Sequence, residues 1–307
     1  MNCIFGIDLG GTEIKIGKFC NGRLIKKYSI KTDASNCGKN ILNDIKKEID
    51  KEIGNDNLIG IGIDIPGPVV KGKVLGAQNI GWEEVDVSAY FLSKYNNIKV
   101  AVLNDANAAA FGEMGFGGAK GYKNLVMITL GTGVGGGVVI DGKLVEGTTG
   151  SSGEVGHIRV ERKNGRKCTC GLYGCLEQYT SATGIVKTAI EMRKGKDTLL
   201  NKDNLTCKEV FDFAKANDKV AIEVVEDMTE YLASGCATIV DVLNPEIIVI
   251  GGGVSKAGDF LLNKVESKFQ ELCFYSTRST KFALATLGND AGIYGAMLSV
   301  LGTSNEN

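Results

Sequence analysis

The 307-residue sequence contains one histidine, one tryptophan and only three prolines. It has no apolar run near the roughly 20 residues that a membrane-spanning helix needs. Its formal net charge of −1 supplies no basic surface for nucleic acid. No secretory signal opens the sequence, and six of the nine cysteines are scattered, so we expect reduced thiols and a cytoplasmic protein. These six are Cys3, Cys20, Cys37, Cys207, Cys236 and Cys273.

Glycine, in contrast, is abundant, with 42 residues, or roughly twice its average share. The glycines are clustered and not periodic, which excludes a collagen-like chain. They mark places where the backbone turns tightly or approaches a ligand. The length predicts two domains with sizeable cores.

Apolar residues follow strand and helix spacings in alternation along the chain, which is typical of an α/β protein. We predict strands at residues 4–8, 14–19, 24–30, 58–65, 100–103, 125–130, 137–140 and 246–250. We predict helices at residues 41–53, 106–114, 177–193, 208–216 and 220–242, and two more that begin at residues 257 and 290.

The only histidine, His157, lies eleven residues before a group of three cysteines, Cys168, Cys170 and Cys175. One imidazole and three thiols are the ligand set of a closed tetrahedral zinc site. Two glycines between the last two cysteines let the backbone fold around one point. The alternatives are three idle thiols, or a redox pair that the lack of a Cys-x-x-Cys spacing disfavours. We therefore predict a structural zinc.

A weak internal repeat places the same pattern in both halves of the chain. Residues 5–17 and 126–138 each read as a strand, a glycine-rich turn and a second strand. Such turns present backbone N–H groups that suit phosphate oxygens. Neither is a Walker A motif, because no Gly-Lys-Ser/Thr follows. Two copies predict two facing domains that hold a nucleotide between them.

Six motifs, in this order and spacing, resemble the ROK family of bacterial sugar kinases and related repressors. They are residues 8–12 with Lys15, then residues 103–108, 130–137, 153–157, 168–177 and 251–253. The resemblance covers residues 4–302 and is strongest to the glucokinase branch. It implies the actin-like (ribonuclease-H-like) ATPase fold, in which two α/β domains flank a cleft, with a zinc-binding loop at residues 157–175. We expect a smaller domain of residues 1–110 plus a C-terminal helix at 290–307, and a larger domain of residues 111–289.

Within this family, Asp105 is the expected catalytic base, which accepts the proton of a sugar hydroxyl. It follows a buried strand and starts a helix, whose dipole should keep it ionised; alone, it would read as a helix cap. The resemblance implies that Asp8 helps to hold Mg²⁺ with ATP, and that Lys15 contacts phosphate, although Lys15 also suits an exposed strand position. The implied nucleotide-binding residues are Asp8, Gly10, Gly11, Thr12, Lys15, Gly131, Thr132, Gly133, Gly251, Gly252 and Gly253.

The resemblance places several loops around the sugar, and their carboxylates and amides suit paired hydrogen bonds to hydroxyls. His157 would bind zinc through one ring nitrogen and offer the other to the sugar. We expect Trp82 to pack behind the Asn79 loop and not against the sugar. The implied substrate-binding residues are Pro66, Gly67, Asn79, Asn104, Asp105, Glu154, His157 and Glu177.

The implied reaction is ATP-dependent phosphorylation of a hexose at its 6-hydroxyl, above all glucose to glucose 6-phosphate. An N-acetylmannosamine or N-acetylglucosamine kinase is the first alternative. A sugar-sensing repressor is the second, but it would carry a winged-helix segment before the first phosphate turn, and Asp8 lies too near the start. The expected partners are a hexose, ATP and further copies of the chain in a homodimer or homotetramer, with no nucleic acid or membrane.

Overall fold

The computed structural model describes residues 1–302 and divides the chain into two compact units. The first unit contains Met1–Gly121, Gly137–Gly153 and the segment that starts at Leu287. The second unit contains Tyr122–Gly136 and Glu154–Thr286. Residues 303–307, the end of the predicted C-terminal helix, lie outside the described residues, and the predicted domain boundary at residue 110 stays a prediction.

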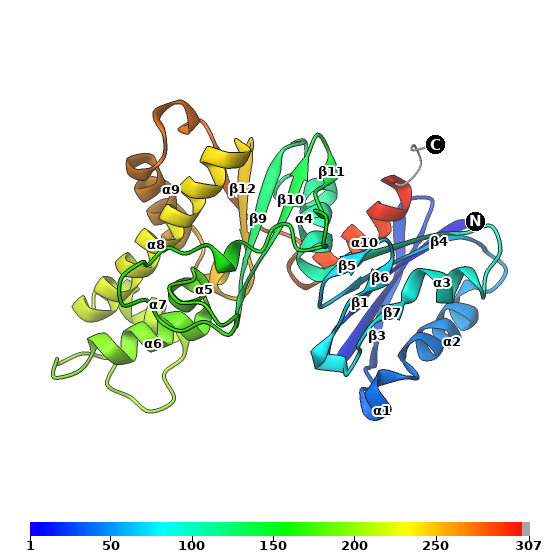
Figure 1. Cartoon of the computed structure of the whole chain (residues 1–307), viewed down its shortest axis with the longest axis horizontal. Coiled ribbons are helices and arrows are strands. Elements are labelled where there is room, and N and C mark those ends of the chain that lie inside the picture. The colour runs from blue at the N-terminus through cyan, green and yellow to red at the C-terminus, as the bar shows by residue number, and fades with distance from the viewer. Residues whose placement is uncertain (303–307) are drawn as a thin grey trace. The chain divides into compact units, whose positions relative to one another are not determined.

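The first unit is built on a five-stranded sheet of order β3-β2-β1-β4-β8 (Figure 1). The first three strands pair antiparallel, whereas β1, β4 and β8 run parallel to one another. The strands are β1 (Asn2–Leu9), β2 (Glu13–Cys20), β3 (Arg23–Lys31), β4 (Asn57–Ile65) and β8 (Lys99–Asn104).

Both faces of this sheet are covered, because alternate side chains of a strand point to opposite faces. Phe5 and Ile7 of β1 belong to the core cluster that includes α2 (Ile41–Ile53), whereas Ile4 packs with α10 (Ala291–Gly302). The contact with α10 is so close that a Cβ on Gly62 would lie 1.8 Å from the carbonyl oxygen of Ala296. Glycine at this position lets the helix lie directly on the sheet.

Several short elements between β4 and β8 were not predicted from the sequence. A small sheet of order β5-β6-β7 and a short helix fill this segment, and α4 follows β8 directly. Strands of two residues are too short to leave a periodic signal. The bounds are β5 (Val69–Val70), β6 (Lys73–Val74), β7 (Val85–Asp86), α3 (Val87–Leu92) and α4 (Asp105–Phe116). Another short helix, α1 (Ser35–Gly38), lies earlier, between β3 and α2.

In the second unit, β9 (Leu125–Leu130), β12 (Ile247–Gly251) and β13 (Lys281–Leu284) are neighbours in that order, and all are parallel. The strand β10 (Val134–Ile140) carries the chain into the first unit, where it forms a hairpin with β11 (Lys143–Leu144). The helices of the second unit are α5 (Glu177–Thr180), α6 (Ala182–Met192), α7 (Cys207–Lys215), α8 (Lys219–Leu243) and α9 (Asp259–Leu272).

The predicted helix at residues 177–193 is wrong as a single element, because it is interrupted at Ser181. Ser181 has an extended backbone, and its side chain accepts a hydrogen bond from the N–H of Gly184. It is therefore the N-cap of a new helix, α6. The other long predicted helices, at residues 41–53 and 220–242, match α2 and α8 within about a residue at each end.

The expectation of six reduced, unpaired cysteines is wrong for Cys3 and Cys20, which form a disulfide. The two residues lie directly opposite each other in the antiparallel pairing of β1 with β2. The remaining seven cysteines are free. Within residues 1–302, no helix combines the length and the apolar character that a bilayer crossing requires.

Candidate functional site

In the first unit, predicted site residues gather where parallel strands end. Asp8 stands at the end of β1, Pro66 and Gly67 follow β4, and Asn104 and Asp105 join β8 to α4. Since β1, β4 and β8 are adjacent and parallel, these positions share one edge of the sheet. The carboxyl ends of parallel strands are the usual ligand-binding edge in α/β proteins.

Asp8 has an ionisable neighbour on each side. Lys15 lies opposite it on β2, and the Lys15 Nζ donates a hydrogen bond to Asp8 Oδ2 at 2.7 Å. Burial disfavours the charge on Lys15, but the hydrogen bond and the attraction of Asp8 outweigh burial and raise the pKa of Lys15. The positive charge of Lys15 is therefore held beside Asp8 at the predicted nucleotide site.

On the other side of Asp8 lies Asp64, its register partner on β4, which the sequence analysis missed. Asp64 is 1% exposed, and its Oδ2 has no hydrogen-bond partner. Burial, followed by repulsion from Asp8 and Asp105, raises the pKa of Asp64 well above its ordinary value. The available signal was a lone acid inside the otherwise apolar run of residues 58–65.

The start of α4 positions Asp105. The side chain of Asn104 caps the helix by accepting hydrogen bonds from the N–H groups of Ala106 (3.0 Å) and Asn107 (3.3 Å). Its amide also donates to the carbonyl of Gly67 at 3.1 Å, which ties the two predicted sugar loops together. Asn104 therefore fixes the backbone from which Asp105 projects.

Asp105 is reachable from solvent, as a general base must be, and its Oδ1 accepts a hydrogen bond from the N–H of Ala106 at 2.8 Å. Desolvation by the surrounding protein nevertheless raises the pKa of its carboxyl group, against this hydrogen bond and with added repulsion from Asp8. The helix N-terminus alone would favour the ionised form, as expected from the sequence, but burial outweighs it. A raised pKa makes a carboxylate a stronger base.

The first glycine turn joins β1 to β2 and is tightly closed. The N–H of Gly10 donates to the carbonyl of Glu13 at 3.0 Å, and Thr32 donates through its hydroxyl to the carbonyl of Gly10 at 2.7 Å. A Cβ on Gly11 would lie 3.4 Å from the Cβ of Asn79. The first glycine turn and the predicted sugar residue Asn79 therefore lie next to each other.

The Asn79 loop rests on Trp82. A β-bridge between Ala77 and Trp82 closes the loop, and the Trp82 ring N–H donates to the carbonyl of Gly38 at 3.1 Å. Trp82 is only 7% exposed. It packs behind the loop, as expected from the sequence.

The second glycine turn lies in the second unit, between β9 and β10. The N–H of Gly131 donates to the carbonyl of Gly133 at 2.9 Å, and the carbonyl of Thr132 accepts a hydrogen bond from the hydroxyl of Thr183 at 3.2 Å. A Cβ on Gly133 would lie only 2.6 Å from Glu177 Oε2. The turn is thus built around Glu177, which is a predicted sugar residue.

A third glycine group lies next to this turn. Gly251 ends β12 and is the register partner of Thr129 on β9. Gly252 has φ of 84°, and a Cβ there would lie 2.4 Å from the carbonyl oxygen of Leu130. The turns after β9 and β12 therefore lie side by side at the carboxyl edge of the second sheet.

A pocket with a volume of about 370 Å³ adjoins Gly253. Its wall includes Phe211 and Lys215 of α7 and Val254 of the turn after Gly253, and its lining is mostly apolar. An apolar pocket beside such a glycine turn suits a flat aromatic base. The α7 residues were missed because they form part of an ordinary amphipathic helix.

The predicted metal ligands His157, Cys168, Cys170 and Cys175 converge. Their ligand atoms all lie within 4.8 Å of one another, with Cys168 Sγ 3.7 Å from His157 Nδ1, and Cys170 Sγ 3.7 Å from Cys175 Sγ. The other ring nitrogen of His157, Nε2, lies 4.0 Å from Glu154 Oε2. The imidazole therefore faces the thiols with one nitrogen and Glu154 with the other.

The fold of the loop explains this convergence. Gly174 has φ of 80° and lies so close to the preceding chain that a Cβ would be 1.8 Å from the carbonyl oxygen of Glu161. Burial opposes ionisation of Cys168, but hydrogen bonds from its cysteine and histidine neighbours outweigh burial and lower its pKa. Burial raises the pKa of Cys175. Cys168 therefore ionises more readily than Cys175.

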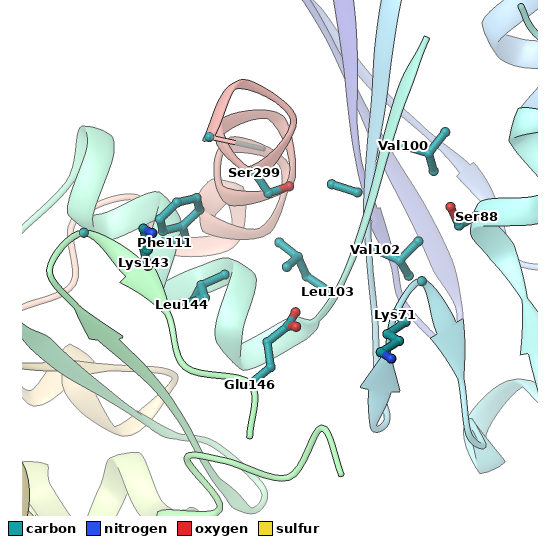
Figure 2. Close-up of a pocket in the computed structure, with 14 residues that line it drawn as sticks. Lys71, Ser88, Val100, Val102, Leu103, Phe111, Lys143, Leu144, Glu146 and Ser299 are labelled. Carbon is teal, nitrogen blue, oxygen red and sulfur yellow. The ribbon is translucent and has the colours of Figure 1, made fainter. Parts of the chain in front are cut away.

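A further pocket, of about 460 Å³, lies in the first unit beside the edge strand β8 (Figure 2). Val102 and Leu103 form part of its wall, and Figure 2 shows the Glu146 carboxylate pointing toward Leu103. Burial raises the pKa of Glu146. None of the predicted substrate-, nucleotide- or metal-binding residues lines this pocket.

Glycine turns and carboxylates at the carboxyl edges of parallel strands, in each of two units, define a phosphate-binding α/β protein. The chain belongs to the ROK family, whose model matches residues 4–302. It is 41% identical to a glucokinase of Halalkalibacterium halodurans, over 94% of this chain and 92% of the relative, and 35% identical to a glucokinase of Thermotoga maritima, over 95% of each. A ROK glucokinase of Streptomyces griseus, solved with glucose and AMPPNP, aligns over 97% of this chain and 98% of its own, with 30% identity and a TM-score of 0.75.

Members with other names are also similar. A xylose repressor of Caldicellulosiruptor bescii is 30% identical over 97% of this chain and 78% of its own length. A structure described as a putative N-acetylmannosamine kinase of Listeria monocytogenes has a TM-score of 0.81 and 26% identity, over 99% of this chain and 100% of its own. Fold alone therefore does not separate these activities.

Proposed function

We propose that this protein transfers the γ-phosphoryl group of ATP to the 6-hydroxyl of glucose. The observation that carries the proposal is the placement of Asp105, at the carboxyl edge of the first sheet and in the first turn of α4, in a chain that is similar over its whole length to glucokinases. Phosphoryl transfer depends mainly on positioning and charge neutralisation, with one base for the attacking hydroxyl.

Asp105 is the proposed base. Its carboxylate would accept the proton of the 6-hydroxyl as the oxygen attacks phosphorus. The raised pKa of Asp105 and its access to solvent support this role. A positioned base of this kind contributes about 10²- to 10⁴-fold to the rate.

The nucleotide is proposed to bind through the three glycine turns. The N–H groups of residues 10–12 and 131–133 would face phosphate oxygens, and the pocket beside Gly253 would hold the adenine. Asp8 and Lys15 form an ion pair beside the first turn. Asp8 suits a hydrated Mg²⁺ bound to the phosphates, since Mg²⁺ takes one or two carboxylates and keeps several waters.

The proposed sugar-binding residues come from both units. Pro66, Gly67, Asn79 and Asn104 belong to the first unit, and Glu154, His157 and Glu177 belong to the second.

Zinc is the proposed occupant of the cysteine–histidine cluster. A tetrahedron with Zn–S distances of about 2.3 Å has edges of roughly 3.8 Å. The 3.7 Å separations of Cys170 from Cys175, and of Cys168 from His157, suit such edges. The ion would fix the orientation of His157 and so act on sugar specificity indirectly. The cytoplasmic location and the homodimeric or homotetrameric state stay predictions.

A coupled assay with ATP and five sugars tests the proposal. The sugars are glucose, mannose, fructose, N-acetylglucosamine and N-acetylmannosamine. We expect the highest kcat/KM with glucose. A higher kcat/KM with either N-acetylated sugar would support the alternative, an N-acetylmannosamine or N-acetylglucosamine kinase. Absence of turnover with all five sugars, together with sugar-dependent binding to DNA, would favour the repressor class.

A further inference from the structure

The break between α5 and α6 exchanges one hydrogen-bond donor for another. In a continuous α-helix, the N–H of Ala182 would donate to the carbonyl of Gln178, four residues earlier. In this structure it donates to the carbonyl of Gly131 in the second glycine turn, at 2.8 Å. The Gln178 carbonyl therefore loses its helical donor, which is costly inside a protein unless another donor takes its place.

Arg166 supplies the replacement donor. Its Nη1 donates to the carbonyl of Gln178 at 2.8 Å and to the hydroxyl of Thr188 at 2.9 Å, and lies 3.4 Å from the carbonyl oxygen of Gly184. Gln178 belongs to α5, whereas Gly184 and Thr188 belong to α6, so one guanidinium group binds both sides of the break. Gly184 permits the close approach, because a Cβ there would lie 2.6 Å from the Gln178 carbonyl oxygen.

Several contacts hold Arg166 in this position. Its guanidinium carbon lies 4.9 Å from the centre of the Tyr179 ring, and its Nη2 donates to the Glu191 carboxylate. The backbone N–H of Arg166 donates to the Tyr179 hydroxyl at 2.9 Å, and its carbonyl accepts from the N–H of Gly174 at 2.9 Å. Since Gly174 belongs to the cysteine–histidine loop, Arg166 joins that loop to the helix break.

The start of α6 in turn holds the second glycine turn. Besides the hydrogen bond from Ala182 to Gly131, the hydroxyl of Thr183 donates to the carbonyl of Thr132 at 3.2 Å. Both acceptors are backbone carbonyls of the turn, so their positions depend on where α6 begins. If α5 and α6 formed one helix, the N–H of Ala182 would no longer be available to Gly131.

We propose that Arg166 is a positioning residue for the nucleotide: it binds the Gln178 carbonyl, and so leaves the N–H of Ala182 to hold the second glycine turn. Without the guanidinium group, that N–H satisfies the Gln178 carbonyl and the turn loses a hydrogen bond. The inference rests on the proposed function, in that this turn binds phosphate oxygens. The exchange of donors does not depend on which sugar is phosphorylated.

The first test compares Arg166→Met with Arg193→Met. Methionine keeps an unbranched apolar side chain beside Tyr179 but offers no donor. We expect calorimetry with a non-hydrolysable ATP analogue to show a Kd raised roughly three- to tenfold in Arg166→Met, as for one lost hydrogen bond. Arg193 is a matched control, because its Nη1 also donates to two backbone carbonyls of the second unit, those of Leu200 at 2.6 Å and Lys202 at 2.8 Å. Arg193→Met should bind the analogue as wild type does.

The second test removes the exchanged donor itself. Ala182→Pro deletes the N–H at the first position of α6, where proline is well tolerated, and Ser181 already has the extended backbone (φ −70°, ψ 160°) that a following proline requires. Lys219→Pro, at the first position of α8, is the control. We expect Ala182→Pro to raise the Kd of the analogue roughly threefold or more and Lys219→Pro to leave it unchanged.

Combining the two changes separates positioning from a general loss of structure. Proline at position 182 has no N–H to give to Gln178, so in the Ala182→Pro protein the Arg166→Met substitution should change the Kd less than about twofold. Two substitutions that act by separate routes would multiply their effects.

NMR detects the exchange without any ligand. The scalar coupling across a hydrogen bond should join the Ala182 nitrogen to the Gly131 carbonyl carbon in wild type and in Arg193→Met. In Arg166→Met it should move to the Gln178 carbonyl. Arg166→Lys, which keeps the charge on a less rigid donor, should retain part of the coupling to Gly131, and it replaces Arg166→Met in both measurements if the latter does not fold.

The outcomes distinguish this inference from the proposed function. If wild type phosphorylates glucose but Arg166→Met keeps a normal Kd or keeps the coupling to Gly131, the positioning role is wrong. Full multiplication of the effects of Arg166→Met and Ala182→Pro would overturn it too. If wild type neither binds the analogue nor phosphorylates glucose, the proposed function fails, while the coupling in Arg166→Met still shows whether Arg166 controls the exchange of donors.

Discussion

The Oε2 atom of Glu177 accepts a hydrogen bond from the backbone N–H of Val134 at 3.1 Å. The other oxygen of the same carboxylate lies 3.9 Å from Cys168 Sγ. Glu177 therefore connects the second glycine turn with the cysteine–histidine cluster. A change in the cluster should reach the turn through this one side chain, which links the proposed zinc to phosphate and sugar binding.

Loss of a cluster cysteine should remove zinc and weaken substrate binding. We expect about one zinc per wild-type chain by elemental analysis, and little or none in Cys170→Ala, because three ligands rarely retain a structural zinc. The KM values for glucose and ATP should both rise, roughly 10- to 100-fold. Cys37→Ala, which changes an exposed free thiol outside the cluster, should keep the zinc. Metal-free wild-type protein with normal sugar affinity would contradict the assignment.

Replacement of Asp105 by Asn should abolish turnover and spare binding. The amide keeps the shape but cannot accept the hydroxyl proton, so kcat should fall by about 100-fold or more while the Kd for glucose changes little. The raised pKa of Asp105 also places the acid limb of the wild-type kcat profile at a higher pH than an ordinary aspartate would give. Asp86→Asn, at the N-cap of α3, is a control that should keep normal turnover. The base assignment fails if Asp105→Asn keeps more than about a tenth of wild-type kcat.

Much of the site could be predicted because apolar strands stop abruptly at polar residues. Asp8 and Asp105 each follow a buried run, and glycine turns mark the ends of β9 and β12. Asp64 could not be predicted in the same way, since it interrupts an apolar strand and its pKa depends on its neighbour Asp8, which lies opposite it on β1. A polar residue at the end of an apolar strand can be recognised from its neighbours in the sequence. The pairing of one strand with another cannot, because the paired residues are far apart in the sequence.

Other features depend on contacts that no local pattern encodes. The Cys3–Cys20 disulfide requires the register of β1 with β2, and the pocket beside Gly253 requires α7 to pack against the turn after β12. The break at Ser181 was readable in principle, because serine is a strong N-cap, but the apolar spacing on both sides continued through it.

The Cys3–Cys20 disulfide should stabilise the first unit without a direct effect on catalysis. Its sequence separation of 17 residues predicts a loss of roughly 3 kcal/mol in the free energy of unfolding upon reduction. Turnover should change little, because the disulfide lies at the opposite end of β1 and β2 from the pair Asp8 and Lys15. Thiol counting in denatured, unreduced protein should give seven free thiols. Nine free thiols, or equal stability with and without reductant, would refute the prediction.

Asp64→Asn should change the pH dependence of stability with a defined sign. The pKa of Asp64 is raised on folding, so above its ordinary value of 3.8 the folded state binds more protons than the unfolded state. The contribution of Asp64 to the wild-type free energy of unfolding should therefore fall with rising pH, by up to about 1.4 kcal/mol per pH unit, until the folded pKa is passed. Asparagine does not titrate and removes this contribution.

Urea unfolding of wild type and Asp64→Asn at several pH values above about 4 measures this difference. Asp64→Asn should become progressively more stable than wild type as the pH rises. Asp33→Asn should show the opposite pH dependence of the stability difference, because hydrogen bonds from Ser35 lower the pKa of Asp33. Below about pH 4, where Asp33 titrates, that variant should lose stability relative to wild type as the pH rises, so its urea series extends to lower pH. A constant difference between wild type and Asp64→Asn would mean that Asp64 is ionised in the folded protein, and that Asp8 and Asp64 form a doubly charged pair.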